Sequence, residues 1–330
     1  MSLLLEHQNA EERLDAPGGN PQSAIRNPQS DRPSGTQEWA ASTLNVAQGC
    51  RHGCLYCYAR FNALRFGQIA TGADWACEKV HADRVAKGYQ GGKGRVMMPS
   101  SHDITPETVD AVATVANKLL TAETPAGKPE TRLLLVTKGD GPCVETVCRA
   151  LLEPSAANDY NLDIWRSRDR VEWRLTIGCL DDRCRKFWEP HAPDIDMRLE
   201  TLRWLYKAGW QTSVSCEPLL KPRRAVDLVM AIQPHVTETI WIGAARELRA
   251  RTAWCRKALG ERLEMAICNL ELWQQPESIR NVAGALRIGL TPEAWAKIRF
   301  KDSYAEVLRG FGWQIENGQV LNAERAEASR

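Results

Sequence analysis

Three cysteines stand close together in the sequence and could bind a metal centre. Cys50, Cys54 and Cys57 follow the spacing C-x3-C-x2-C. Cysteine thiolates are the usual ligands of iron–sulfur clusters, and a cluster of four irons ordinarily takes four of them. Three thiolates would leave one iron open to a ligand from solution. The spacing therefore predicts an iron–sulfur site that is open at one position.

Two other interpretations of these cysteines stay open. The three positions also fall on one face of a helix, where free cysteines often pack as small apolar residues. Gly49 and Gly53 disfavour a helix interior there. Structural zinc is the second alternative, but it favours paired C-x2-C units or a Cys/His quartet. In the neighbouring sequence only His52 could complete such a set.

The cysteine spacing, with Tyr56 just before the last cysteine, resembles the signature of the radical S-adenosylmethionine (radical SAM) enzymes. The resemblance implies a 4Fe-4S cluster on Cys50, Cys54 and Cys57, with SAM bound to the fourth iron. It also implies an external electron donor of the flavodoxin or ferredoxin kind, and reductive cleavage of SAM. In such enzymes the cofactor carries the difficult chemistry, while the protein orients it and excludes water.

Composition indicates an intracellular globular enzyme. The 330 residues suffice for one large or two ordinary domains, and 43 basic residues nearly balance 41 acidic ones. This balance does not support a dedicated nucleic-acid-binding protein, although a local basic groove is compatible with it. The eleven cysteines are odd in number, and no signal sequence opens the chain, so we expect a reducing cytoplasm rather than disulfides. No apolar run is long enough to cross a bilayer.

The chain divides into three parts by composition. Residues 1–38 are rich in Pro, Gly, Gln, Asn and Ser, repeat the tetrapeptide Asn-Pro-Gln-Ser, and are expected to form a disordered polar tail. Residues 39–245 alternate strand-like and helix-like patterns, which predicts an α/β fold with a parallel sheet. Residues 246–330 are expected to form a mainly helical extension that packs on it.

Six strands are expected in the middle part. They cover residues 43–46, 96–99, 132–137, 173–177, 212–215 and 239–242. Helices are expected to begin at Thr105 and after Asp194, and the second should stop at Gly209. Six strand–helix units match the partial (β/α)6 TIM-like barrel that the radical SAM resemblance implies. In the extension we expect a strand or loop near 265–268 and a helix opened by Thr291, with Trp295 and Ile298 against the barrel.

Polar segments follow four of these strands, at residues 99–103, 137–140, 176–179 and 213–218. In barrels of this kind the chemistry lies at the carboxyl ends of the strands. Over roughly residues 43–245 the chain resembles the branch of radical SAM proteins that includes spore photoproduct lyase. The matching segments are Asn45 to Cys50 (with Val46 in place of the usual proline), His52-Gly53-Cys54, Cys57-Tyr58-Ala59, Thr137-Lys138, Trp188-Glu189-Pro190, Ala192-Pro193 and Arg198-Leu199.

The resemblance implies roles in SAM binding for several of these residues. Tyr56 would lie against the adenine, and Lys138 would pair with the SAM carboxylate. Many family members hold the SAM amino group with a Gly-Gly-Glu turn that is absent here, so Ser100, Ser101 or Asp103 would substitute. Tyr56 could equally be packed in the core, and Lys138 could be a solvated lysine after a strand.

The last two strand ends add further candidates. Thr176 and Ser215 could donate hydrogen bonds to ribose or carboxylate, or could be ordinary half-buried strand residues. Glu217 needs a partner because it follows an apolar strand, and we expect an arginine or a substrate group. Cys179 and Cys216 are candidates to return a hydrogen atom to a substrate radical, as a cysteine does in photoproduct lyase. The remaining cysteines are expected to be scattered buried thiols.

We therefore expect a radical SAM enzyme with an unidentified substrate. Repair of a DNA photolesion, as in spore photoproduct lyase, is an alternative within this class, but a shared fold does not transmit a substrate. A non-catalytic iron–sulfur or zinc protein acting as a sensor or scaffold is the alternative from another class. It predicts a bound metal without cleavage of SAM.

Overall fold

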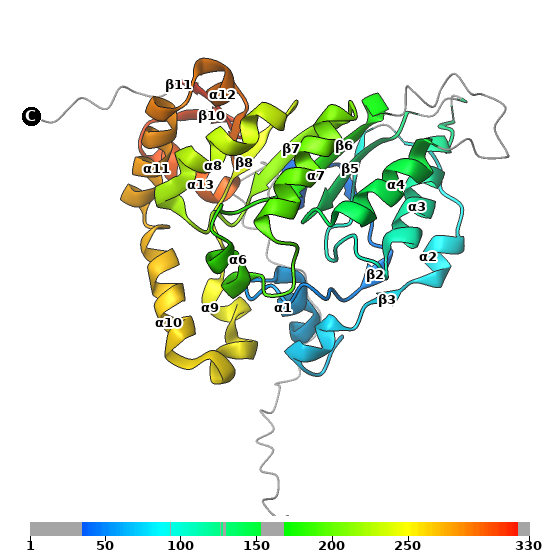
Figure 1. Cartoon of the computed structure of the whole chain (residues 1–330), viewed down its shortest axis with the longest axis horizontal. Coiled ribbons are helices and arrows are strands. Elements are labelled where there is room, and N and C mark those ends of the chain that lie inside the picture. Colours follow the sequence, from blue (N-terminus) through cyan, green and yellow to red (C-terminus); the bar gives the residue numbers. More distant parts are fainter. Residues whose placement is uncertain (1–34, 93, 126, 128–129, 153–167, 323–330) are drawn as a thin grey trace, which may run out of the picture. The chain divides into compact units, whose positions relative to one another are not determined.

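The computed structural model describes residues 35–92, 94–125, 127, 130–152 and 168–322. They belong to one compact unit. Its centre is a seven-stranded sheet in the order β1-β4-β5-β6-β7-β8-β9. Every neighbouring pair in it is parallel. The strands curl into a partial barrel with helices on the outside, so the predicted α/β partial-barrel fold is confirmed (Figure 1).

The seven strands have the bounds Ser42–Thr43 (β1), Arg95–Met98 (β4), Arg132–Thr137 (β5), Val171–Thr176 (β6), Gln211–Cys216 (β7), Ile240–Ile242 (β8) and Ile298–Phe300 (β9). The longest registers join β6 to its two neighbours, where Leu133 of β5 pairs with Val171 and Thr176 pairs with Ser215 of β7. Because the connections between parallel strands need long crossovers, the helices lie between the strands in sequence.

Six helices cover the outer face of the sheet: Val109–Thr121 (α3), Gly141–Leu152 (α4), Ile195–Lys207 (α7), Ala225–Ile232 (α8), Pro276–Gly289 (α11) and Asp302–Gly310 (α13). Their apolar faces and every second strand residue form one large hydrophobic core. The alternation follows from the strand period of two, which sends neighbouring side chains to opposite faces. Leu133 and Leu135 of β5 face this core, whereas Leu134 packs on the inner face.

Short elements gather at the end of the sheet where the strands finish. They are Ala47–Gln48 (β2), Tyr58–Arg65 (α1), Gly72–Ala76 (η2), Lys79–Val80 (β3), Ala82–Ala86 (α2), Asp182–Trp188 (α6), Leu248–Arg251 (α9), Ala253–Cys255 (η6) and Arg256–Leu272 (α10). Strands β2 and β3 form a small antiparallel pair. The chain finishes with Pro292–Ala296 (α12), Gln314–Glu316 (β10) and Gln319–Asn322 (β11). No helix of the described residues is both long and apolar enough to span a membrane.

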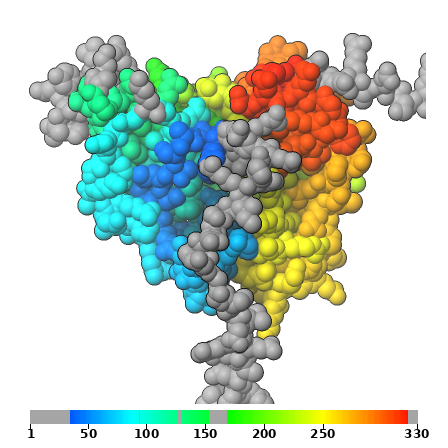
Figure 2. All heavy atoms as spheres, turned by 180° about the vertical axis from the view of Figure 1, so that it is seen from behind, coloured from blue at the N-terminus to red at the C-terminus, as the bar shows by residue number. Residues whose placement is uncertain are grey.

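The first described residues run across the inner face of the sheet. Lys301, just after edge strand β9, donates hydrogen bonds to the Gly35 carbonyl (2.6 Å) and pairs with Glu38 (2.9 Å). The Trp39 ring then stacks between Lys301 and Arg174, with ring-to-cation distances of 4.4 and 4.7 Å. The chain continues into β1 at the opposite edge. In Figure 2 the blue residues lie between the cyan and the red parts of the chain.

Three sequence expectations need correction. A seventh strand, β9, comes from beyond residue 245 and pairs with β8, so Ile298 is a strand residue rather than part of a helix. Residues 265–268 lie inside helix α10 and form neither strand nor loop. Gly35–Glu38 forms a 3-10 turn instead of continuing the disordered tail. Residues 1–34 of that tail, with both tetrapeptide copies, lie outside the described residues.

Both ends of helix α7 and the start of helix α12 lie where the sequence predicted them. Asp194 caps α7, because its Oδ1 accepts a hydrogen bond from the Met197 amide at 2.8 Å. Gly209 follows that helix in the left-handed conformation (φ +78°). Thr291 caps α12 in the same manner as Asp194 caps α7. Helix α3, however, begins three residues later than expected, because its N-cap is Thr108 rather than Thr105.

Candidate functional site

The three cysteines lie on a loop, residues 49–57, that we call the cysteine loop. Gly49 opens it with φ +91°, and a Cβ there would lie 2.2 Å from the Cys77 carbonyl oxygen. Only glycine fits this close approach. The Cys50 amide then donates to the Trp75 carbonyl at 2.7 Å. Cys57 ends the loop as the N-cap of α1.

The thiols are largely withdrawn from water. Cys54 is buried, while Cys50 and Cys57 are half-buried. Burial raises the pKa of the Cys50 thiol well above its usual range, and nearby Asp103, Cys54 and Cys57 raise it further. Burial also raises the pKa of Cys54 to about 12. The thiols of Cys50 and Cys54 are therefore neutral without a metal, and a bound cation would reverse this by stabilising thiolates.

The donor set fits an iron–sulfur cluster by its chemistry. Cys54 and Cys57 lie close enough to Cys50 to raise the pKa of its thiol, and so does Asp103, which follows β4. In the described part of the chain, no three Cys, His, Asp or Glu side chains are placed to hold a single metal ion. Thiolates of a 4Fe-4S cluster bind separate irons, so they do not need to converge on one point.

A first buried carboxylate, Asp103, connects the cysteine loop to β5. Its Oδ2 lies 3.2 Å from His52 Nδ1, in the loop. Its Oδ1 accepts hydrogen bonds from Thr137 Oγ1 at 2.6 Å and from the Ile104 amide at 2.7 Å. The Lys138 amide donates to Oδ2 at 3.0 Å. Burial alone would raise the pKa of Asp103, but His52, Thr137 and Lys138 lower it below its usual value.

A second buried carboxylate, Glu189, receives three donors. Lys138 Nζ lies 2.6 Å from its Oε1, the Tyr56 hydroxyl donates to the same oxygen, and Arg198 pairs with Oε2. Glu189 is 1% exposed. Burial would raise its pKa, but Lys138 and Arg198 hold it well below the usual range. Glu189 is thus an anion that joins the cysteine loop, the end of β5 and helix α7.

Backbone hydrogen bonds run beside this carboxylate. The Leu55 amide donates to the Trp188 carbonyl at 2.8 Å, and the His191 amide donates to the His52 carbonyl at 3.1 Å. Residues 188–191 therefore lie along the cysteine loop. Figure 1 shows α1, α6 and α9 at the same end of the sheet.

The segment after β4 lies at the entrance to the loop. Asn45 Oδ1 accepts hydrogen bonds from the amides of Ser100 (2.8 Å) and Ser101 (2.9 Å), and Asn45 Nδ2 donates to Ser100 Oγ at 2.9 Å. The Tyr58 hydroxyl donates to the Ser100 carbonyl. Ser100, Ser101 and Asp103 were expected to take the place of the turn that holds the SAM amino group. Hydrogen bonds through Asn45 and Tyr58, and the contact of Asp103 with His52, place them beside the cysteine loop.

The other candidates lie along the strand ends. Thr176 and Ser215 pair in register on adjacent strands. Thr176 is half-buried and Ser215 is buried. Glu217 Oε2 lies 3.9 Å from Lys301 Nζ, and the Glu217 side chain is 28% exposed. Burial raises the pKa of Glu217, whereas Lys301 lowers it.

The structure separates the two candidate hydrogen donors. Cys179 belongs to the small core that contains Leu55 of the cysteine loop. A hydrogen bond from neighbouring Cys184 lowers the pKa of Cys179. Cys216 instead lies in the large core between sheet and helices, where burial raises its pKa. Of the two, Cys179 is the one that packs with the cysteine loop.

Several residues of the site were not assigned roles from the sequence. Glu189 and Arg198 stood in matched motifs, and their contact could not be inferred from spacing. Asn45 was noted only as a motif position, and His52 as a motif position and as a possible zinc ligand; neither was expected to hold the loop. Nothing in the sequence suggested a role for Arg60 apart from its position three residues after Cys57.

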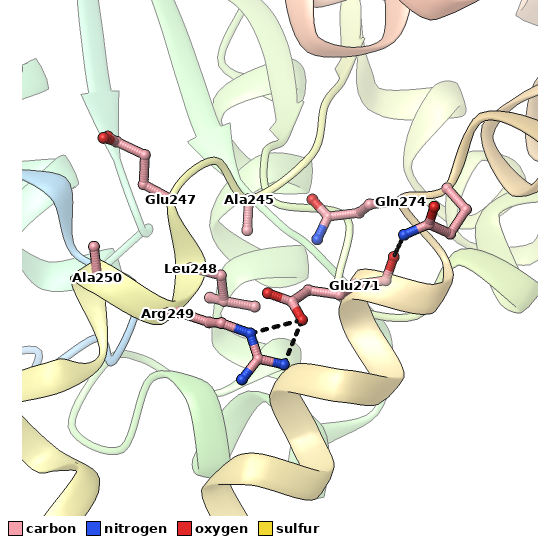
Figure 3. A pocket seen from close by; sticks show the side chains of 8 residues that line it. Ala245, Glu247, Leu248, Arg249, Ala250, Glu271 and Gln274 are labelled. Carbon is pink, nitrogen blue, oxygen red and sulfur yellow. Dashed lines mark hydrogen bonds and ion pairs between the residues drawn. The ribbon is translucent and has the colours of Figure 1, made fainter.

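A groove of about 540 Å³ lies between α9 and α10. Its lining includes Arg249 and Glu271, whose side chains pair at 2.7 Å (Figure 3). Glu247, at its edge, adopts the left-handed conformation with φ +51°. The groove is lined by none of the residues predicted to form the site.

Comparison with known proteins gives relatives of similar sequence. Uncharacterized protein ORF301 of Acidianus two-tailed virus is 28% identical over 200 residues, which cover 56% of this chain and 57% of that protein. Uncharacterized protein MJ0683 of Methanocaldococcus jannaschii is 24% identical over 181 residues, covering 55% of this chain and 61% of that protein. The chain thus spans about three fifths of the length of these relatives. No family model matches it.

Solved structures of similar fold include a point mutant of spore photoproduct lyase, with a TM-score of 0.48 and 14% identity over 74% of this chain and 71% of that one. Another lyase mutant, solved with dinucleoside spore photoproduct, has a TM-score of 0.44 and 15% identity over 66% and 60%. Streptococcus suis SuiB bound to S-adenosylmethionine has a TM-score of 0.35 and 9% identity over 67% and 48%.

Proposed function

We propose that this chain is a radical SAM enzyme. Cys50, Cys54 and Cys57 would hold a 4Fe-4S cluster, and SAM would bind the iron that they leave open. When bound, this pair of cofactors supplies a radical by reductive cleavage of SAM, with electrons from a flavodoxin- or ferredoxin-like donor. The observation that supports the proposal most is the cysteine loop, with three thiols held at the carboxyl ends of parallel strands by two buried carboxylates.

Some of the candidate SAM-binding residues already use their polar atoms in hydrogen bonds within the protein, which makes direct contact with SAM less favourable for them. Both oxygens of Asp103 are occupied by protein donors, so we assign it to holding the loop. Lys138 Nζ is likewise engaged by Glu189 and by the Tyr56 hydroxyl. Among the described residues the Ser100 hydroxyl accepts one hydrogen bond, from Asn45, and the Ser101 hydroxyl has no partner, so these two hydroxyls are the better candidates for direct contact with the SAM amino group. The Tyr56 ring, tethered through its hydroxyl, would keep a fixed orientation beside the adenine.

Substrate binding is proposed for the mouth of the barrel. Thr176 and Ser215 present hydroxyls from neighbouring strands on the inner face, and Glu217 adds a partly exposed carboxylate. Cys179 is the preferred donor of a hydrogen atom to a substrate radical, because it packs with the loop.

The experiment that tests the proposal uses protein reconstituted with iron and sulfide without oxygen. It is reduced with dithionite and given SAM, and 5'-deoxyadenosine, iron and zinc are quantified. Cys54→Ala is the inactive variant, and Cys268→Ala, which removes an exposed thiol from α10, is the matched control. Deoxyadenosine from the parent and Cys268→Ala, but not from Cys54→Ala, is the expected result. A cluster without SAM cleavage would favour a sensor or scaffold, and zinc in place of iron would overturn the mechanism.

A further inference from the structure

Arg60 is a buried arginine directly beside the cysteine loop. It lies in α1, three residues after Cys57, and is 2% exposed. Its Nη1 donates a hydrogen bond to the Cys54 carbonyl at 3.3 Å, and its backbone amide donates to Cys57 Sγ at 3.4 Å. The guanidinium stacks on Trp254, 4.0 Å from the ring centroid. Arg60 therefore contacts two of the three predicted metal ligands.

The guanidinium of Arg60 has no carboxylate within ion-pair distance among the residues that the structure describes. Its Nε is buried without a hydrogen-bond partner there. Burial of an unpaired charge is costly, and buried charges in proteins are normally paired. Two other buried arginines follow that rule: Arg174 pairs with Glu172 at 2.7 Å, and Arg198 pairs with Glu189.

The buried carboxylates around the loop do not balance the positive charge of Arg60. Lys138 and Arg198 share one carboxylate, Glu189. Asp103 adds a second negative charge. A third carboxylate with a buried side chain, Glu78, pairs with Arg51 of the loop at 3.5 Å. Each of these carboxylates thus has a partner of its own, and none of them pairs with Arg60. A buried arginine without a carboxylate partner is accounted for if an anion binds beside it.

We propose that Arg60 is the counter-ion of an anionic metal centre bound by Cys50, Cys54 and Cys57. This inference rests on the proposed function. A 4Fe-4S cluster on three thiolates carries negative charge, and its reduction adds one more negative charge. A fixed, dry guanidinium beside it stabilises the reduced state more than the oxidised one. Arg60 is accordingly a positioning and tuning residue, which eases the reduction on which SAM cleavage depends.

The test compares substitutions that separate charge from packing. Arg60→Met keeps an apolar stem without charge, Arg60→Gln can keep the hydrogen bond to the Cys54 carbonyl without charge, and Arg60→Lys keeps the charge. The control is Arg174→Met, which removes an equally buried arginine that stacks on Trp39 but has its carboxylate. Thermal unfolding is measured on the metal-free proteins, and the midpoint potential of the cluster on the reconstituted ones.

Loss of the Arg60 charge is expected to leave the metal-free protein as stable as the parent or more stable, but to make reduction of the cluster in the loaded protein less favourable. Metal-free Arg60→Met unfolds at the parent's temperature or above, because an unpaired buried charge is gone, whereas Arg174→Met unfolds earlier. In the loaded proteins, Arg60→Met and Arg60→Gln make reduction at least about tenfold less favourable, which equals about 59 mV for one electron. Arg60→Lys and Arg174→Met stay near the parent potential.

Three results would overturn the inference. A metal-free Arg60→Met that is destabilised as much as Arg174→Met would show a structural role alone. An unchanged potential in both Arg60→Met and Arg60→Gln would show that the charge is not felt by the cluster. A parent that takes up no iron would refute the proposed function and this inference together, whereas the first two results leave the proposed function intact.

Discussion

Glu189→Gln is the substitution that most severely tests the account of how the cysteine loop is held. Gln preserves the shape of the side chain but removes the charge that Lys138 and Arg198 both face. All three side chains are at most 11% exposed. Removal of one partner from a buried pair typically costs about 3–5 kcal/mol of unfolding free energy, because the remaining charge is left uncompensated. Here two cations would be left, so we expect the upper part of that range.

Urea unfolding of the metal-free protein measures this loss, and a thermal scan should show a decrease in melting temperature of roughly 8–10 °C, at about 2 °C per kcal/mol. Hydrogen exchange should also accelerate at the Leu55 amide, which pairs beside Glu189. The matched control is Glu264→Gln, where a partly exposed glutamate pairs with Arg249 and Arg256. Exposed pairs are worth about 0–1 kcal/mol. Equal stability of Glu189→Gln and Glu264→Gln would refute the reasoning.

Three further substitutions have expected outcomes. Gly49→Ala should cost about 1–3 kcal/mol or more through backbone strain and collision with the Cys77 carbonyl, and should lower iron retention, measured by iron assay after desalting; normal retention would contradict this. Burial raises the pKa of Glu38 to about 7 against the opposing effect of Lys301. The folded state therefore binds the extra proton, so the parent should lose stability as pH rises from about 4.5 to 7, and Glu38→Gln should lack this dependence in urea titrations at several pH values; parallel curves would contradict it. Asp103→Asn should cost about 2–3 kcal/mol by the loss of a charged acceptor, and because the pKa of Asp103 is lowered, the difference from the parent should shrink in acid, below the usual aspartate range. A constant difference across pH would be inconsistent with that.

Long apolar segments made most of the sheet predictable. Arg132–Thr137 is a strand in both the sequence analysis and the structure, since a run of buried Leu and Val residues has few alternatives. Strand β9 was missed because it has three residues, Ile298–Phe300, and they directly follow a helix. Residues 265–268 were misjudged because a short apolar run does not distinguish strand from helix.

The site was predictable to the extent that its chemistry is local in sequence. The three cysteines and Tyr56 lie within one loop, so their spacing alone suggested a metal centre. The contact of Tyr56 with Glu189 joins residues 133 positions apart, and it depends on where β5, α6 and α7 end in space. Arg60 was invisible for a similar reason: its burial and the absence of a carboxylate among its described neighbours are properties of packing.

The most direct test of the central claim is electron paramagnetic resonance of the reduced, reconstituted protein before and after addition of SAM. An open iron–sulfur cluster on Cys50, Cys54 and Cys57 predicts a cluster signal that changes when SAM binds and that is lost in Cys54→Ala. A signal that SAM leaves unchanged, or a protein that holds zinc and gives no signal, would contradict it.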